Sequence, residues 1–127
     1  MTDEDPWARI VGPCYTSASL ARVLRWTETD VTEAAASLRI LEVVTNDGAV
    51  LYPAFQVADG RVVAGLPEVL QVLSTGTRSR WTWAQWLNGR LKDEDGNKLP
   101  SAVEQLSAGE LDDVLREAHH DAWAWSS

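Results

Sequence analysis

Apolar residues recur near the start of the chain with the period of an α-helix. Between residues 16 and 26, three apolar residues fall at the i, i+3, i+4 spacing, namely Leu20, Val23 and Leu24. Thr16 or Ser17 would cap this helix, because a hydroxyl oxygen can accept a backbone N–H of the first turn. The pattern therefore predicts a short amphipathic helix.

A second helical pattern covers residues 27–41, with a cap expected at Thr29 or Asp30. Its apolar face would consist of Val31, Ala34, Ala35 and Leu38. Only three or four residues separate the two helices, and short helices joined so closely predict a helix-turn-helix. The turn of such a unit usually carries glycine in the left-handed conformation. This chain has Arg25 there, so we expect a turn of different construction.

A β-hairpin is expected directly after the second helix. Residues 41–45 and 49–55 are rich in β-branched and aromatic residues, and Asn46-Asp47-Gly48 between them is a turn signal. Pro53 cannot donate a ladder hydrogen bond, so the second strand should lie at a sheet edge or stop at Tyr52. A helix-turn-helix followed by a hairpin predicts a winged helix, with the hairpin as the wing.

Helical patterns dominate the rest of the chain. A turn-rich stretch over 57–65 suggests a short strand, and helices are expected over 66–74, 80–89, 99–109 and 110–125, with Ser79 as one cap. The fold class would be mainly α with a small β-hairpin. Its parts would be a tail (1–12), a winged helix-turn-helix (13–60), a linking segment with a helix (61–76) and a C-terminal helical, partner-binding domain (77–127).

Length and composition fit one compact domain, or two very small ones that share a core. The chain has 127 residues, 45% of them hydrophobic. No apolar run approaches the roughly 18 residues that a membrane span needs, and the acidic start lacks the basic region of a signal peptide. A single cysteine, Cys14, excludes an internal disulfide framework. We therefore expect a cytoplasmic protein.

The sequence offers no set of residues typical of catalysis, so we expect no enzyme and no cofactor. His119 and His120 have no serine or cysteine partner at a suggestive spacing, and no glycine-rich phosphate loop occurs. Adjacent histidines on a helix do not face one another, which argues against a metal site. The segment 93–104 imitates a calcium loop, but Lys98 stands where that loop needs glycine.

The second helix would be the recognition helix of the helix-turn-helix. A net charge of −8 argues against general polyanion binding, and residues 1–75 hold five arginines against ten carboxylates. A local set of contacts can still be assigned from the outward positions and the nearby cations. The candidate DNA-binding residues are Arg22, Arg25, Thr29, Thr32, Glu33 and Arg39. The alternative is a scaffold that keeps the fold without binding DNA.

Tryptophan positions suggest a protein interface. Trp83 and Trp86 share the apolar face of one predicted helix and are expected in the core. Trp81 cannot share that face well, and Trp123 and Trp125 lie in the last five residues, where a small domain has little core left. Exposed aromatic residues are enriched at interfaces, so these three are the candidate partner-binding residues, and a homodimer is expected.

Several stretches resemble antitoxin-type proteins of the Xre/ParS-like family, which accompany toxins with a RES domain. The stretches are "YPAFQV", "GLPEVLQVL", "WLN" and "LPSAVEQLSAG". Trp86-Leu87, the loop 90–98, Pro100, Leu106, Gly109 and Val114 fit the toxin-binding pattern of that family, whereas the leucine order around 96–100 departs from it. The resemblance implies a DNA-binding homodimer that neutralises an NAD-consuming RES-domain toxin and regulates its own transcription.

Two other functions stay open from the sequence. One is a stand-alone transcriptional regulator without a toxin, and the other is an interaction scaffold that no longer binds DNA. A neighbouring gene for a RES-domain protein would favour the antitoxin function over both.

Overall fold

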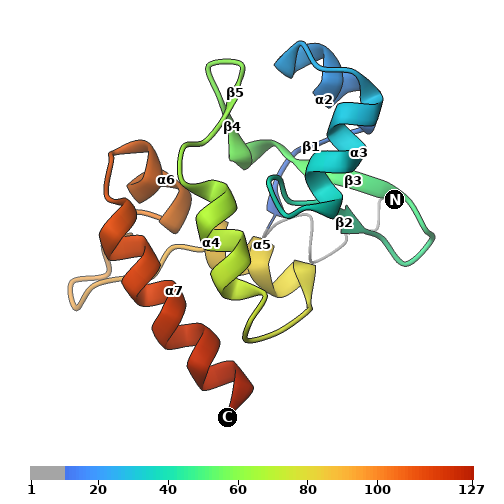
Figure 1. Cartoon of the computed structure of the whole chain (residues 1–127). Helices are drawn as coiled ribbons and strands as arrows, with labels where there is room; N and C mark the ends of the chain where they lie inside the picture. Colours follow the sequence, from blue (N-terminus) through green and yellow to red (C-terminus); the bar gives the residue numbers. More distant parts are fainter. Residues whose placement is uncertain (1–10) are drawn as a thin grey trace, which may run out of the picture.

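The computed structural model describes residues 11–127, so residues 1–10 of the expected tail lie outside the described part. Figure 1 shows helices throughout, with a few short strands between them. The fold is mainly α with a small antiparallel β part. The elements in chain order are β1 (Cys14–Tyr15), α2 (Ser17–Leu24), α3 (Glu28–Ala36), β2 (Val43–Val44), β3 (Val50–Pro53), the 3-10 turn η1 (Ala54–Gln56), β4 (Val57–Ala58), β5 (Arg61–Val62), α4 (Leu66–Leu73), α5 (Arg80–Asn88), α6 (Ala102–Ser107) and α7 (Leu111–Ser126).

Strand β3 lies in the middle of a three-stranded antiparallel sheet, in the order β1-β3-β2. The expectation that Pro53 would confine this strand to an edge, or stop it at Tyr52, is wrong. Strand β2 pairs only with the first two residues of β3, so no partner on that side requires a donor from Pro53. On the other side Pro53 lies opposite Cys14, and the next N–H, that of Ala54, donates to the Pro13 carbonyl at 2.9 Å.

The turn-rich stretch after β3 forms a second hairpin, in which Val57 faces Val62 and Ala58 faces Arg61. Asp59 and Gly60 make its tip, with φ angles of 55° and 74°. Two successive residues with positive φ build the tight turn that suits the twist of a hairpin, which explains the Asp-Gly pair. The sequence predicted a short strand here, and the structure has two.

The buried apolar residues form two hydrophobic cores. The smaller one joins the inner faces of α2 and α3 and consists of Leu20, Ala21, Leu24, Val31, Ala34, Ala35, Ile40 and Tyr52. The larger one surrounds α4, whose expected apolar residues, Leu66, Val69, Leu70 and Leu73, are all fully buried. Helix α7 lies along α4 (Figure 1). Helical periodicity predicted the buried face of α4 fully, and those of α2 and α3 except for Val23 and Leu38, which are only partly buried.

The larger core also takes residues from the N-terminal part of the chain. Leu41 and Val43 belong to it, although both lie within the segment 13–60. Their neighbour Gln56 is fully buried and binds Leu41 twice. Its Oε1 accepts the Leu41 N–H at 2.7 Å, and its Nε2 donates to the Leu41 carbonyl at 2.8 Å. The expected boundaries at residues 60 and 76 remain a prediction.

The start of α5 is attached to strand β2 and the residue before it. The Trp81 indole N–H donates to the Val44 carbonyl at 3.1 Å, and the Arg80 guanidinium donates to the Glu42 carbonyl at 3.5 Å. The Glu42 carboxylate in turn accepts the Tyr52 hydroxyl at 2.8 Å. Burial, reinforced by that carboxylate, raises the pKa of Tyr52. These contacts position the C-terminal helices relative to α2 and α3.

Substitution of Gln56 tests the link between η1 and the segment before β2. Gln56→Ala leaves the buried N–H and carbonyl of Leu41 without partners, so we expect a loss of roughly 2–4 kcal/mol in the free energy of unfolding. Gln71→Ala, at an exposed position on α4, is the matched control and should change stability little. Urea denaturation measures both. Equal small effects would show that the Gln56 side chain does not stabilise this link.

Candidate functional site

The turn between α2 and α3 has the left-handed residue that a helix-turn-helix usually places there. Arg25 has φ 60° and ψ 39°, the Trp26 N–H donates to the Ala21 carbonyl at 2.9 Å, and the Arg25 N–H donates to the Arg22 carbonyl at 3.4 Å. The expectation of a differently built turn is therefore wrong. An arginine takes the conformation that glycine adopts most easily, at a cost on the order of 1 kcal/mol.

Helix α3 begins earlier than expected, because Thr27 and not Thr29 or Asp30 is its cap. The Thr27 hydroxyl accepts the Asp30 N–H and the Asp30 carboxylate accepts the Thr27 N–H, both at 3.0 Å. That backbone hydrogen bond from Thr27 is the main cause that lowers the pKa of Asp30. Thr29 is left on the exposed side of the first turn.

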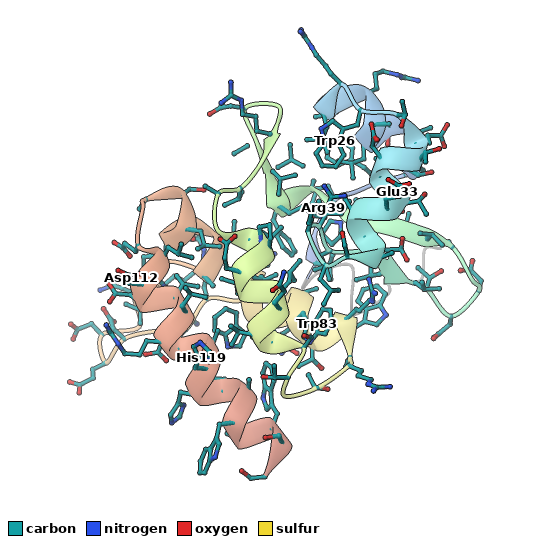
Figure 2. The ribbon with its side chains drawn as sticks, in the orientation of Figure 1. Trp26, Glu33, Arg39, Trp83, Asp112 and His119 are labelled. Atoms are coloured by element: carbon teal, nitrogen blue, oxygen red, sulfur yellow. The ribbon has the colours of Figure 1, made fainter. Side chains whose placement is uncertain are left out.

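Helix α3 also ends earlier than expected, at Ala36, so Arg39 lies beyond this helix and not on it (Figure 2). Leu38 has φ 59°, which breaks the helix, and the Arg39 N–H donates back to the Ala34 carbonyl at 2.8 Å. The Arg39 Nε then donates to the Ser37 hydroxyl at 2.9 Å. Arg39 is therefore held at the C-terminal end of α3.

All six candidate DNA-binding residues are exposed. Thr29, Thr32 and Glu33 share the outer side of α3, and Figure 2 shows Glu33 pointing away from the molecule. Arg22 and Arg25 lie at the end of α2 and in the following turn, apart from Arg39 at the far end of α3. Along the chain, the three polar α3 residues thus lie between the pair Arg22 and Arg25 and the single cation Arg39.

Several carboxylates of the segment 13–60 accept hydrogen bonds from nearby groups of the same segment. Residues 13–60 carry three arginines and six carboxylates. Glu28 accepts the Ser17 hydroxyl at 3.1 Å, and Asp30 and Glu42 have the partners given above. Asp47, at the tip of the β2–β3 hairpin, accepts from the Thr45 hydroxyl, which lowers its pKa. The tip carries no cation, so it is a poor reader of the minor groove.

A second candidate surface is a groove of about 820 Å³ between α5, α6 and α7, which we call the C-terminal groove. Its lining comes from three helices and the loop 89–101. The lining residues are Thr82, Gln85, Trp86, Gly89, Arg90, Leu91, Leu99, Pro100, Ala102, Gln105, Glu110, Val114, Glu117, Asp121 and Trp125. The Trp86 indole N–H donates to the Asp121 carboxylate at 2.6 Å and so joins its two sides.

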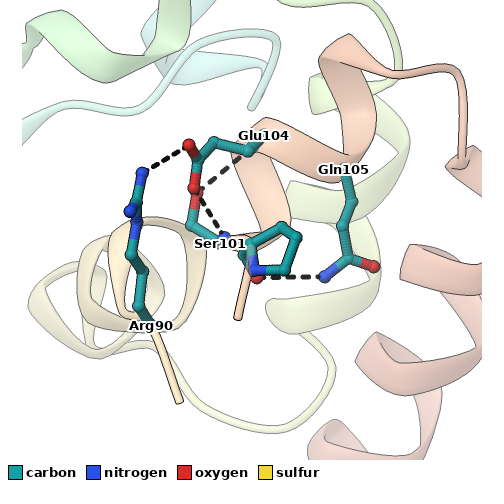
Figure 3. Close-up of polar contacts among 5 residues, drawn as sticks. Arg90, Ser101, Glu104 and Gln105 are labelled. Atoms are coloured by element: carbon teal, nitrogen blue, oxygen red, sulfur yellow. Dashed lines mark hydrogen bonds and ion pairs between the residues drawn. The ribbon is translucent and has the colours of Figure 1, made fainter. Parts of the chain in front are cut away.

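The loop side of the groove is ordered by a polar cluster, shown in Figure 3. The Ser101 N–H donates to the Glu104 carboxylate at 2.9 Å, and the Glu104 N–H donates to the Ser101 hydroxyl at 3.2 Å. The carboxylate also binds Arg90, and its pKa is lowered chiefly by the backbone hydrogen bond from Ser101. The Gln105 side chain donates to the Pro100 carbonyl at 3.4 Å.

The three tryptophans that were expected to bind a partner do not share one surface. Trp81 packs against the larger core and contacts β2. Trp125 is partly buried and lines the C-terminal groove, whereas Trp123 is 69% exposed and is not among the lining residues. Sequence reasoning missed Leu91 and Leu99, which line this groove, because they lie in a loop that reads as polar.

The histidines and the acidic loop form no metal site in the described chain. Within residues 11–127, no group of three or more His, Cys, Asp or Glu side chains could hold an ion. Asp93 accepts the N–H groups of Asp95 and Asn97, both at 2.9 Å, so its carboxylate closes a polar turn.

None of the helices in residues 11–127 has the length and apolar character to cross a membrane.

Glycine at position 25 tests the left-handed turn. Arg25→Gly should raise the free energy of unfolding by up to about 1 kcal/mol, because glycine adopts positive φ without the steric cost. Arg22→Gly removes the same charge from the regular part of α2 and should lower stability by about 1 kcal/mol. Urea unfolding compares the two. If both variants are destabilised alike, Arg25 is not left-handed in solution.

Comparison with known proteins gives a fold and no family. No family model matches the chain, and no curated protein matches it. The NMR structure of Rv2175c is similar, with a TM-score of 0.67, 24% sequence identity, and coverage of 96% of this chain and 85% of that chain. At this identity the similarity shows a shared fold alone. This chain therefore has the fold of Rv2175c over nearly its whole length.

Proposed function

We propose that this protein is a DNA-binding regulator, in which α2, α3 and the β2–β3 hairpin act as a winged helix-turn-helix. The observation that carries the proposal is the left-handed turn at Arg25. It ends α2 and lets α3 begin three residues later at Glu28, after its cap Thr27, with the inner faces of both helices buried together. This arrangement leaves the outer side of α3 available to enter a major groove.

The exposed residues fall into two roles in this proposal. Thr29, Thr32 and Glu33 lie in the N-terminal and central turns of α3, the part of a recognition helix that contacts base edges. Arg22, Arg25 and Arg39 flank them and would bind phosphates. Glu33 would accept from a cytosine amino group, which makes it a determinant of specificity and a cost to affinity.

The charge of residues 13–60 determines how strongly the proposed winged helix-turn-helix would bind DNA. Three arginines against six carboxylates over residues 13–60 give little general attraction to DNA. Part of this negative charge lies at helix starts and at the hairpin tip, engaged with nearby N–H and hydroxyl groups. We expect weak and strongly salt-dependent binding, carried by the few arginines beside α3.

A second candidate function is that of an antitoxin, and the exposed apolar lining of the C-terminal groove favours it. Here the C-terminal helices would hold a protein partner, and the family resemblance proposes a RES-domain toxin that consumes NAD. A homodimer belongs to the same proposal. Co-expression with a RES-domain protein encoded by a neighbouring gene tests it through co-purification and through loss of NAD consumption.

Fluorescence anisotropy with a duplex from the protein's own promoter region tests DNA binding. Arg22→Ala, Arg25→Ala and Arg39→Ala should each weaken binding and lower the slope of log affinity against log salt by about one unit. Thr32→Ala should reduce preference for this duplex over unrelated DNA while leaving the slope unchanged.

Arg116→Ala is the matched control, because it removes the same charge from an exposed position on α7. It should leave both affinity and slope unchanged. An equal loss with Arg116→Ala, or the absence of binding by the wild-type chain at the lowest salt, would contradict the proposed DNA surface and favour the scaffold function.

A further inference from the structure

Two solvent-exposed leucines line the C-terminal groove, and hydrogen bonds hold the loop that carries them. Leu91 is 77% exposed and Leu99 is 41% exposed, and both line the groove. They are held together, because the Leu99 N–H donates to the Leu91 carbonyl at 2.7 Å. The Asp93 turn closes the loop between them, where the Asp93 N–H donates to the Asn97 carbonyl at 2.9 Å. Ordered, exposed leucines beside a groove are typical of an interaction surface.

The deeper part of the groove is aromatic and aliphatic. Trp86, Ala102 and Val114 line it, and each also belongs to the larger core or packs against it. Trp125 adds a partly buried indole from the last turn of α7. A groove with this lining can bury the apolar side of a helix or of an extended segment.

The α7 side of the groove is acidic. Glu110, Glu117 and Asp121 line it together with Val114 and Trp125, at the three- and four-residue spacing of a single stripe along the helix. Arg90 is the cation among the described lining residues, and it is bound to Glu104. The groove therefore combines an apolar floor with a negative wall, which complements a positively charged, amphipathic ligand.

We propose that the C-terminal groove binds a cationic, amphipathic segment of a partner protein, with leucine-like side chains against Leu91, Leu99 and Trp86 and with lysine or arginine side chains against Glu117 and Asp121. A second copy of this chain fits the groove poorly, because each copy has a net charge of −8. Nucleic acid fits it poorly for the same reason, since the acidic wall repels phosphates.

This inference is independent of the DNA-binding proposal, because the groove contains none of the six candidate DNA-binding residues. It also changes the expectation for the three candidate partner-binding tryptophans, Trp81, Trp123 and Trp125, because of these three Trp125 alone lines the groove. Trp123 lies two residues before Trp125, about 160° away around the helix, and points elsewhere.

A fluorescently labelled peptide of about 14 residues, built from lysine and leucine at helical spacing, is the probe for the full chain. A peptide of the same pattern with glutamate in place of lysine is the control ligand. The lysine peptide should bind with at least about tenfold higher affinity than the glutamate peptide. Leu91→Ser should weaken binding of the lysine peptide roughly tenfold, without a change in the urea midpoint.

Two charge variants on α7 distinguish attraction by the carboxylates that line the groove from attraction by the net charge of the protein. Glu117→Gln removes a lining carboxylate and should weaken peptide binding roughly two- to fivefold. Asp112→Asn removes the same charge five residues earlier, about 140° around the helix, and should have no effect. Figure 2 shows Asp112 projecting from α7 on the side away from α4.

Three results would overturn the proposal. If Glu117→Gln and Asp112→Asn lower the affinity for the lysine peptide equally, net charge alone explains the attraction. If the lysine and glutamate peptides bind with equal affinity, the acidic wall plays no role. Light scattering that shows a wild-type dimer, converted to a monomer by Leu91→Ser, would assign the groove to a second copy of the chain. Each of these outcomes leaves the DNA measurements unaffected.

Discussion

The two hydrophobic cores share a short segment, residues 40–43, whose side chains alternate between them. Ile40 belongs to the core of α2 and α3, and Glu42 binds the hydroxyl of Tyr52 from the same core. Leu41 and Val43 belong to the core around α4. Gln56 fixes the Leu41 backbone, and α5 is attached through Glu42 and Val44. The orientation of the candidate DNA surface relative to the groove follows from this alternation.

Periodicity predicted the helical faces well, because a buried stripe leaves a direct trace in sequence. The α4 residues are buried as expected, and so are Leu20, Leu24, Val31, Ala34 and Ala35 of α2 and α3 and Val114, Ala118 and Ala122 of α7. Val23 is only partly buried, and Leu38 lies beyond α3 and packs against the larger core. The sequence did not predict the backbone conformation at the ends of these helices. Arg25 and Leu38 both take positive φ without being glycine, and the helix ends that they define depend on hydrogen bonds and packing that no local pattern shows.

The sheet and the groove were hidden from sequence for a related reason. Strand β1 has only two residues and exists because β3 pairs with it, so no propensity could predict it or the central position of Pro53. The groove takes its lining from three helices and a loop, and its most exposed leucines lie in that loop. By contrast, the exposure of Thr29, Thr32 and Glu33 could be predicted, because it needs only the helical phase of α3.

The sharing of residues 40–43 between two cores also governs how this chain can evolve. A recombination event near this segment would separate Ile40 from Leu41 and Val43, and would leave apolar surface of both cores in water. The segment that contains α2 and α3 is therefore poorly suited to being transferred intact from one protein to another by recombination. Point substitutions on the outer side of α3 are accommodated more easily, because Thr29, Thr32 and Glu33 are exposed and belong to neither core.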